Sequence, residues 1–226
     1  MSVELWTKPV PHLHFGRLEP FYPERIGVTV LEAPGASPSY NRYLDFADPQ
    51  LAQLIEYAVW WDYDIGHLYE LEHVWTYIAH DGRVLNAECS FHGRYLRALR
   101  RDCSNMRDET HMVIYAQPGK HSFSPIRDWF ELLPNVEEAC SETMAGDGRL
   151  LVNELFQHAF TTNDTIDWQV RQYLKTHVFV PSLQFEYFDI NQELMTTWEQ
   201  LAEEIPTRIH GWIERLATEY PKFGQS

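Results

Sequence analysis

Residues 60–82 read WWDYDIGHLYELEHVWTYIAHDG, and this stretch predicts a long β-strand that ends in a tight turn. From residue 70 to 78 the side chains alternate between two sets, which is the period of a strand with two different faces. One set contains Glu70, Glu72, Val74, Thr76 and Ile78, and the other contains Leu71, His73, Trp75 and Tyr77. The HDG turn and the following RVLNAECSF (83–91) predict that the strand returns as a β-hairpin.

Other segments extend this pattern. Strands are expected at 26–33 (IGVTVLEA), 111–121 (HMVIYAQPGKH) and 183–190 (LQFEYFDI), and helices at 125–140, 165–177, 192–204 and from Pro206 onward. We therefore expect a mainly β (α+β) fold, an antiparallel β-sandwich with a helical C-terminal segment. The predicted domain organisation is a β-sandwich metal-site domain over residues 1–189, with residues 190–226 packed on it as the helical segment.

The composition excludes several classes of function. The 226 residues include 33 acidic and 18 basic side chains, so the net charge is −15, which disfavours nucleic acid and anionic membrane surfaces as partners. The N-terminal sequence has no pattern of a signal peptide, and no segment is long and apolar enough to span a membrane. Three cysteines without a CxxC pair fit reduced thiols, so a cytoplasmic location is expected.

Histidines and glutamates gather where the predicted strands begin and end. His67 enters the long strand, and Glu70 and Glu72 follow on one face of it. Hairpin geometry brings His92, at the end of the return strand, to the same end of the sheet, and His121 lies in a glycine turn after a third strand. These side chains could converge on one divalent cation, and mixed imidazole and carboxylate ligands favour zinc, manganese or iron over calcium or magnesium.

Two other interpretations of the same residues stay open. In a helix, His67, Glu70 and His73 would be spaced as in a di-iron bundle, although no second Glu-x-x-His motif on a long helix is present. The histidines can also be surface or hydrogen-bonded residues without any metal. The β-branched and aromatic composition of the run and the hairpin signal after it favour the strand.

Three pieces of the sequence, in order, resemble a known pattern. They are GHLYELEHVWTYI (66–78), FHGRY (91–95) and VIYAQPGKHSFSP (113–125). The trio resembles the necrosis- and ethylene-inducing peptide-like proteins, with their GHRHDWE heptapeptide, and a plant and fungal family with a vacuolar-protein-sorting name. The match covers about residues 55–125. Leu71 stands in place of the heptapeptide tryptophan, and Leu68 and Tyr69 in place of its Arg-His pair.

The resemblance implies a β-sandwich with a divalent cation at one end. It places His67, Glu70, His92 and His121 around the cation, and Glu72 at the closing glutamate of the heptapeptide. An additional acidic ligand is expected just upstream, for which Asp62 and Asp64 are both candidates. The toxin group is secreted and disulfide-bonded, and this chain shows neither feature, so cytolysis is not carried over.

Three functions are therefore considered. The first is a metal-dependent hydrolase, in which His67, Glu70, His92 and His121 hold the ion and Glu72 takes a proton from the metal-bound water. The sequence does not distinguish the roles of Glu70 and Glu72, because both lie on one strand face. The second is a non-catalytic, cation-dependent module that binds a carbohydrate, head group or other small molecule. The third is a protein without a metal, in which the histidines are only hydrogen-bonded.

The C-terminal segment raises one question about partners. Its apolar residues recur at helical spacing (Trp198, Leu201, Ile209, Trp212 and Leu216). Such a stripe either packs on the body of the same chain, which we expect, or forms a homodimer contact.

Overall fold

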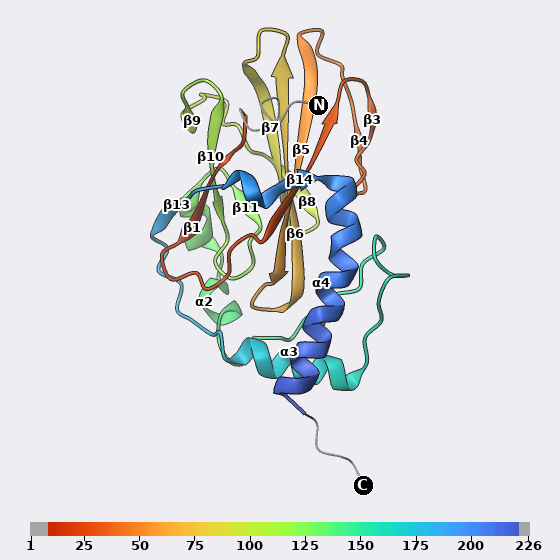
Figure 1. Ribbon diagram of the computed structural model, residues 1–226. Helices are drawn as coiled ribbons and strands as arrows, with labels where there is room; N and C mark the ends of the chain where they lie inside the picture. Colours follow the sequence, from red (N-terminus) through yellow and green to blue (C-terminus); the bar gives the residue numbers. More distant parts are fainter. Residues whose placement is uncertain (1–8, 222–226) are drawn as a thin grey trace.

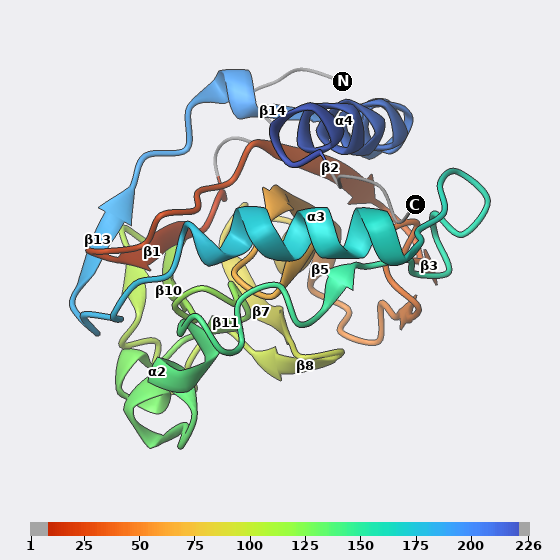
Figure 2. The ribbon, with the colours of Figure 1, turned by 90° about the horizontal axis from the view of Figure 1, so that it is seen from below.

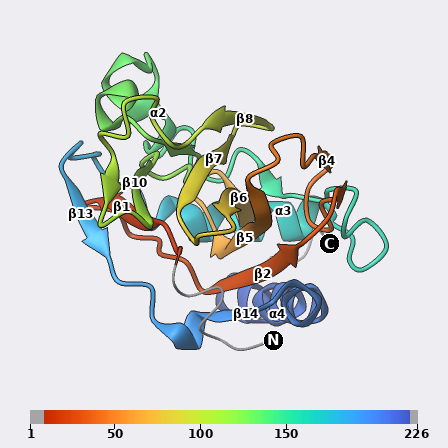
Figure 3. The ribbon, with the colours of Figure 1, turned by 90° about the horizontal axis from the view of Figure 1, so that it is seen from above.

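The computed structural model describes residues 9–221. Residues 1–8 of the predicted sandwich domain and residues 222–226 of the predicted helical segment lie outside the described residues. Two β-sheets form the body (Figures 1 and 3). The larger sheet has the strand order β14 (Met195–Thr197), β2 (Arg25–Leu31), β5 (Leu51–Tyr63), β6 (His67–Ala79), β7 (Val84–Phe91) and β8 (Arg94–Arg97), with β12 (Arg149–Leu150) beside β6.

The second sheet has the order β11 (Phe123–Ser124), β10 (His111–Ala116), β1 (His12–Gly16) and β13 (Phe185–Phe188), with β9 (Met106–Arg107) paired to β10. Strands β3 (Gly35–Ala36) and β4 (Tyr43–Leu44) form a separate pair. The mainly β sandwich predicted from the sequence is confirmed. Its sheets are mixed, however, because β1 with β10, β12 with β6 and β14 with β2 pair in parallel and the remaining pairs are antiparallel.

The stretch at 60–82 forms the centre of the larger sheet. Strand β6 pairs antiparallel with β5 on one side and with β7 on the other, which confirms the predicted strand and hairpin. The β5–β6 register places Val59 opposite Glu72 and Trp61 opposite Glu70, so these residues share one face. Trp61 on this face contacts Phe15 of β1, whereas Trp60 on the other face stacks on Tyr69.

Both faces of the larger sheet are covered because its two central strands are apolar on both sides. The second sheet covers one face (Figure 3), and helices α3 (Asp164–Lys175) and α4 (Trp198–Glu219) lie against other parts of the body (Figure 2). Helix α4 comes directly after β14 in the chain and packs against β2, which it approaches closely at Gly27. A Cβ atom added at Gly27 would lie only 3.0 Å from Leu201 and 3.2 Å from Trp198.

Two helix predictions were wrong in detail. The predicted helix at 192–204 is instead a short 3-10 turn, η2 (Gln192–Leu194), strand β14 and the start of α4. Helix α4 then continues through Pro206, which was expected at a first helical position. Proline in a helix interior costs about 3 kcal/mol. The buried side chains of Leu201, Ile205 and Ile209 on either side of it hold the helix on the sheet nevertheless.

The segment at 125–140, predicted as one helix, contains only the 3-10 helix η1 (Arg127–Leu132) and the four-residue helix α2 (Val136–Ala139). Pro134 separates them, because the residue before a proline is biased away from helical geometry. The predicted helix at 165–177 is present as α3, capped by the side chain of Asn163. Among residues 9–221, no helix combines the length and the apolar character of a membrane span.

The apolar stripe of the C-terminal segment packs within the chain, as expected. Trp198, Leu201, Ile209 and Leu216 are buried in the main core, and Trp212 packs against it. The stripe is therefore used in the contact of α4 with the body.

Leu201→Ala tests this contact. Leu201 of α4 is fully buried against β2, so we predict that the substitution lowers the free energy of unfolding by about 2–5 kcal/mol, the usual cost of such a cavity. Glu203→Ala, at an exposed position of the same helix, is the matched control and should change it by less than about 0.5 kcal/mol. Chemical denaturation measures both values, and equal effects would contradict the packing.

Candidate metal centre

The turn between β5 and β6 is built around the carboxylate of Asp64. Its Oδ1 atom accepts hydrogen bonds from the backbone N–H groups of Gly66 and His67, each at 2.6 Å. Other loops hold the same turn, since Ile65 donates to the Gly119 carbonyl and Gly148 donates to the Gly66 carbonyl. The side chain of Asp64 is completely buried. The turn is therefore fixed from several directions.

His67 presents one ring nitrogen without a proton. Its Nδ1 atom lies 2.7 Å from the carbonyl oxygen of Tyr69, which can only accept, so Nδ1–H is the donor. Burial, the largest influence, lowers the pKa of His67 and favours the neutral ring. In the neutral ring Nε2 then carries a lone pair, and this atom lies 3.6 Å from Oε2 of Glu70. A carbonyl that orients a histidine in this way is the usual second contact of a metal-ligating imidazole.

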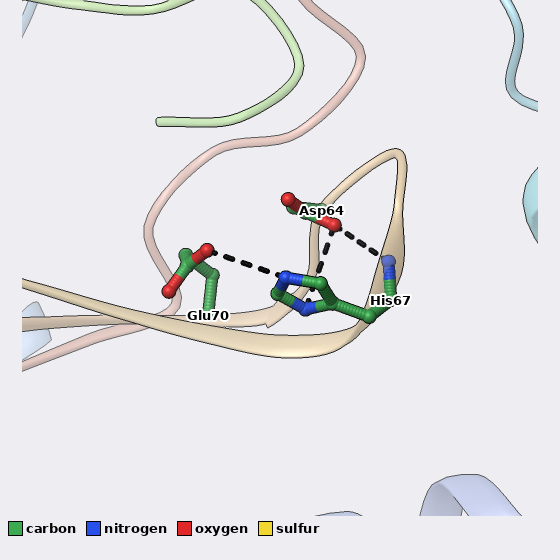
Figure 4. A group of neighbouring side chains, drawn as sticks. All are labelled: Asp64, His67 and Glu70. Atoms are coloured by element: carbon green, nitrogen blue, oxygen red, sulfur yellow. Dashed lines mark hydrogen bonds and ion pairs between the residues drawn. The ribbon is translucent and has the colours of Figure 1, made fainter. Parts of the chain in front are cut away.

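A break in strand geometry brings His67 and Glu70 together. Residues three apart on a regular strand point to opposite faces. Tyr69 between them has a φ of 52°, in the left-handed region, and the β5–β6 register has no pair at this residue. This irregularity lets both side chains face Asp64 (Figure 4).

Asp64, His67 and Glu70 each offer one ligand atom, and these three atoms lie within 4.8 Å of one another. Two carboxylate oxygens and one imidazole nitrogen are a donor set that suits zinc, manganese or iron. The lone pair of His67 and the geometry of the turn fit such an ion, so this buried group could hold a metal.

The charges of the two carboxyl groups respond to opposite influences. Burial alone would raise the pKa of Asp64, but His67, Lys120 and the backbone N–H of His67 hold it below its ordinary value. The Lys120 ammonium lies 3.1 Å from Oδ2 of Asp64. For Glu70, burial raises the pKa well above the ordinary value, and the charges of Glu72 and Asp64 add to this effect. Oε1 of Glu70 accepts from the backbone N–H of Leu71 at 2.8 Å.

The other predicted site residues lie around this group with different partners. His92 donates from Nε2 to Oε1 of Gln117 at 2.7 Å. His121 is buried, stacks on Trp61, and has its Nε2 atom 3.3 Å from Oε1 of Glu19. Neither histidine belongs to the group of ligand atoms within 4.8 Å, so ligation by His92 and His121 stays a prediction.

Glu72 and Asp62 are also engaged elsewhere. One oxygen of Glu72 accepts from Ser122 at 2.6 Å and the other accepts from Ser90, and burial raises the pKa of this glutamate. Asp62 forms a two-pronged ion pair with Arg208 of α4, at 2.7 and 2.9 Å. Of the two upstream acidic candidates, Asp64 is therefore the one that faces His67.

The raised pKa of Glu70 generates a prediction about pH. When a carboxyl group has a higher pKa in the folded chain than in the unfolded chain, the folded protein loses stability with rising pH. The loss occurs between the pKa of the unfolded state and the pKa of the folded state. In metal-free protein we therefore predict that Glu70→Gln increases the unfolding free energy at pH 7 and changes it little near pH ~4. Thermal or urea unfolding at the two pH values tests this, with Glu131→Gln as an exposed control. A loss of stability at pH 7 would contradict it.

The chain matches no family model, and no curated protein matches it. Among solved structures, NLPPya in complex with mannosamine is similar to this chain, with a TM-score of 0.39 and 16% sequence identity. The alignment covers 78% of this chain and 89% of that chain. A similarity of this size assigns neither a family nor a ligand to the chain.

Proposed function

We propose that this protein is a divalent-cation-binding β-sandwich protein, in which Asp64, His67 and Glu70 hold the ion and the ion helps to bind a small polar ligand. The observation that carries the proposal is the orientation of His67. Its Nδ1–H is used by the Tyr69 carbonyl, so the lone pair of Nε2 faces the Glu70 carboxylate. Two carboxylates around an unprotonated imidazole nitrogen are a favourable site for a dication.

A cavity that shares Glu70 with the triad supports a ligand-binding function. Its volume is about 760 Å³, and its walls come from residues 36–43, from β6 between Tyr69 and His73, and from Leu151 and residues 153–155. Tyr40, Tyr43 and Tyr69 contribute aromatic surface, and Glu70 and Asn153 contribute polar groups. An apolar pocket with a few polar groups is the usual form of a small-molecule site. We propose that a carbohydrate, a head group or a similar small molecule binds here.

Hydrolysis is the second candidate, and the position of Glu72 argues against it. A general base needs an oxygen that is free to take a proton from water. Both oxygens of Glu72 accept hydrogen bonds from serine hydroxyls, and the side chain is buried. Glu72 thus resembles a structural carboxylate more than a base, and a binding function needs no base.

A cytoplasmic location is proposed on chemical grounds. Cys89, Cys103 and Cys140 are all free thiols, and Cys103 is exposed. Free thiols persist in reducing compartments. The homodimer considered above has no support from the α4 stripe, which is buried within the chain.

Isothermal titration calorimetry with zinc, manganese and calcium chlorides tests the proposed site. We predict about one equivalent of bound zinc or manganese, and a loss of affinity of more than about tenfold in His67→Ala, because a ligand is removed. His92→Ala, His121→Ala and Glu72→Gln are compared in the same titrations and should keep most of the affinity. Equal losses in His92→Ala and His67→Ala would favour the wider ligand set predicted from the sequence. Absence of binding in the parent protein would contradict the proposed function.

A further inference from the structure

Lys120 reaches into the proposed metal centre from a different part of the chain. It lies in the glycine turn after β10, and its Nζ atom is 3.1 Å from Oδ2 of Asp64. The other oxygen of Asp64 is already used by the backbone N–H groups of Gly66 and His67. Oδ2 is therefore the oxygen of Asp64 that the backbone does not use, and the ammonium group is beside it.

The path of the lysine depends on Gly66. A Cβ atom added at this glycine would lie 2.0 Å from Nζ and 3.3 Å from Cε of Lys120, and 3.4 Å from Oδ1 of Asp64. The clash falls on the far end of a flexible side chain and leaves the backbone free. A Cβ atom at position 66 would thus displace the ammonium group, and the atoms nearest to it all belong to side chains.

We propose that Lys120 is a tethered counter-cation that occupies the charge position of the metal ion and competes with it for Asp64. The inference rests on the proposed metal-binding function. With the metal absent, the ammonium group compensates the fully buried carboxylate, which would otherwise carry a large desolvation cost. A dication on Oδ2 and an ammonium group 3.1 Å from the same oxygen repel each other, so each cation weakens the binding of the other.

The lysine has a way out of the site. Its side chain is 26% exposed, whereas that of Asp64 is 0% exposed, so the ammonium group can turn into solvent while the carboxylate stays in place. Metal binding thus exchanges one cation for another at a preformed oxygen. Lys120 lowers the affinity of the site for the ion and at the same time stabilises the metal-free protein.

Lys120→Met tests both consequences, because they have opposite signs. We expect zinc or manganese to bind at least about tenfold more tightly to Lys120→Met than to the parent, which corresponds to ~1.4 kcal/mol. The metal-free variant should also unfold at a lower temperature than the metal-free parent. Lys175→Met is the matched control, because the Lys175 ammonium pairs at 4.0 Å with the exposed Glu142 and not with a residue of the triad. It should change neither quantity.

Gly66→Ala provides a second route to the same state. It should displace the ammonium group by steric contact, raise the metal affinity in the same direction, and add nothing further in the double variant with Lys120→Met. This outcome separates competition from a general effect of the substitution.

The possible results distinguish the two proposals. If parent and Lys120→Met bind the metal with equal affinity, the competition is refuted and the metal site stands. If Lys120→Met binds the metal and the parent does not, the competition is confirmed, and metal binding by the parent protein, the proposed function, is refuted. If neither protein binds any tested metal, both are wrong.

Discussion

The buried carboxylate of Asp64 is the interaction on which the candidate site depends. It accepts two backbone N–H groups of its own turn and faces the Lys120 ammonium from the glycine turn after β10. Removing a carboxylate from water is costly unless hydrogen bonds and charge compensate it. Asp64 therefore fixes the β5–β6 turn, and it joins the two sheets of the sandwich at the end where His67 enters β6.

The same carboxylate gives the site its chemistry. His67 is placed by the turn that Asp64 closes, and the left-handed residue Tyr69 then lets Glu70 approach the imidazole. The result is a compact group of donors on a rigid hairpin. Glu72, the nearby candidate for a general base, is held by two serine hydroxyls.

The sequence predicted the parts of the fold that follow from periodicity. The alternation at 70–78 identified β6 and its return strand, and the spacing of apolar residues identified α4 as a packed helix. The parallel pairs and the passage of α4 through Pro206 arise from tertiary contacts, which no local pattern records. Strand β14 was missed for this reason, because its pairing with β2 involves only three residues from a helix-like segment.

For the site, alternation placed Glu70 and Glu72 on one face, which agrees with the register of the hairpin. It could not bring His67 to Glu70, because that contact requires the positive φ of Tyr69. It also could not rank Asp64 above Asp62, since the choice is made by Arg208 of α4, 146 residues away. The glycine at position 66 was a usable signal, because a glycine beside a tight turn often marks a close approach.

A crystal structure of the zinc-soaked protein, with an anomalous difference map at the zinc edge, tests whether the turn at Asp64 holds a metal ion. We predict one strong peak bound by Nε2 of His67 and by carboxylate oxygens of Asp64 and Glu70, at about 2.0–2.2 Å. A peak held by His92 and His121 without Asp64, or no peak at this turn, would contradict it.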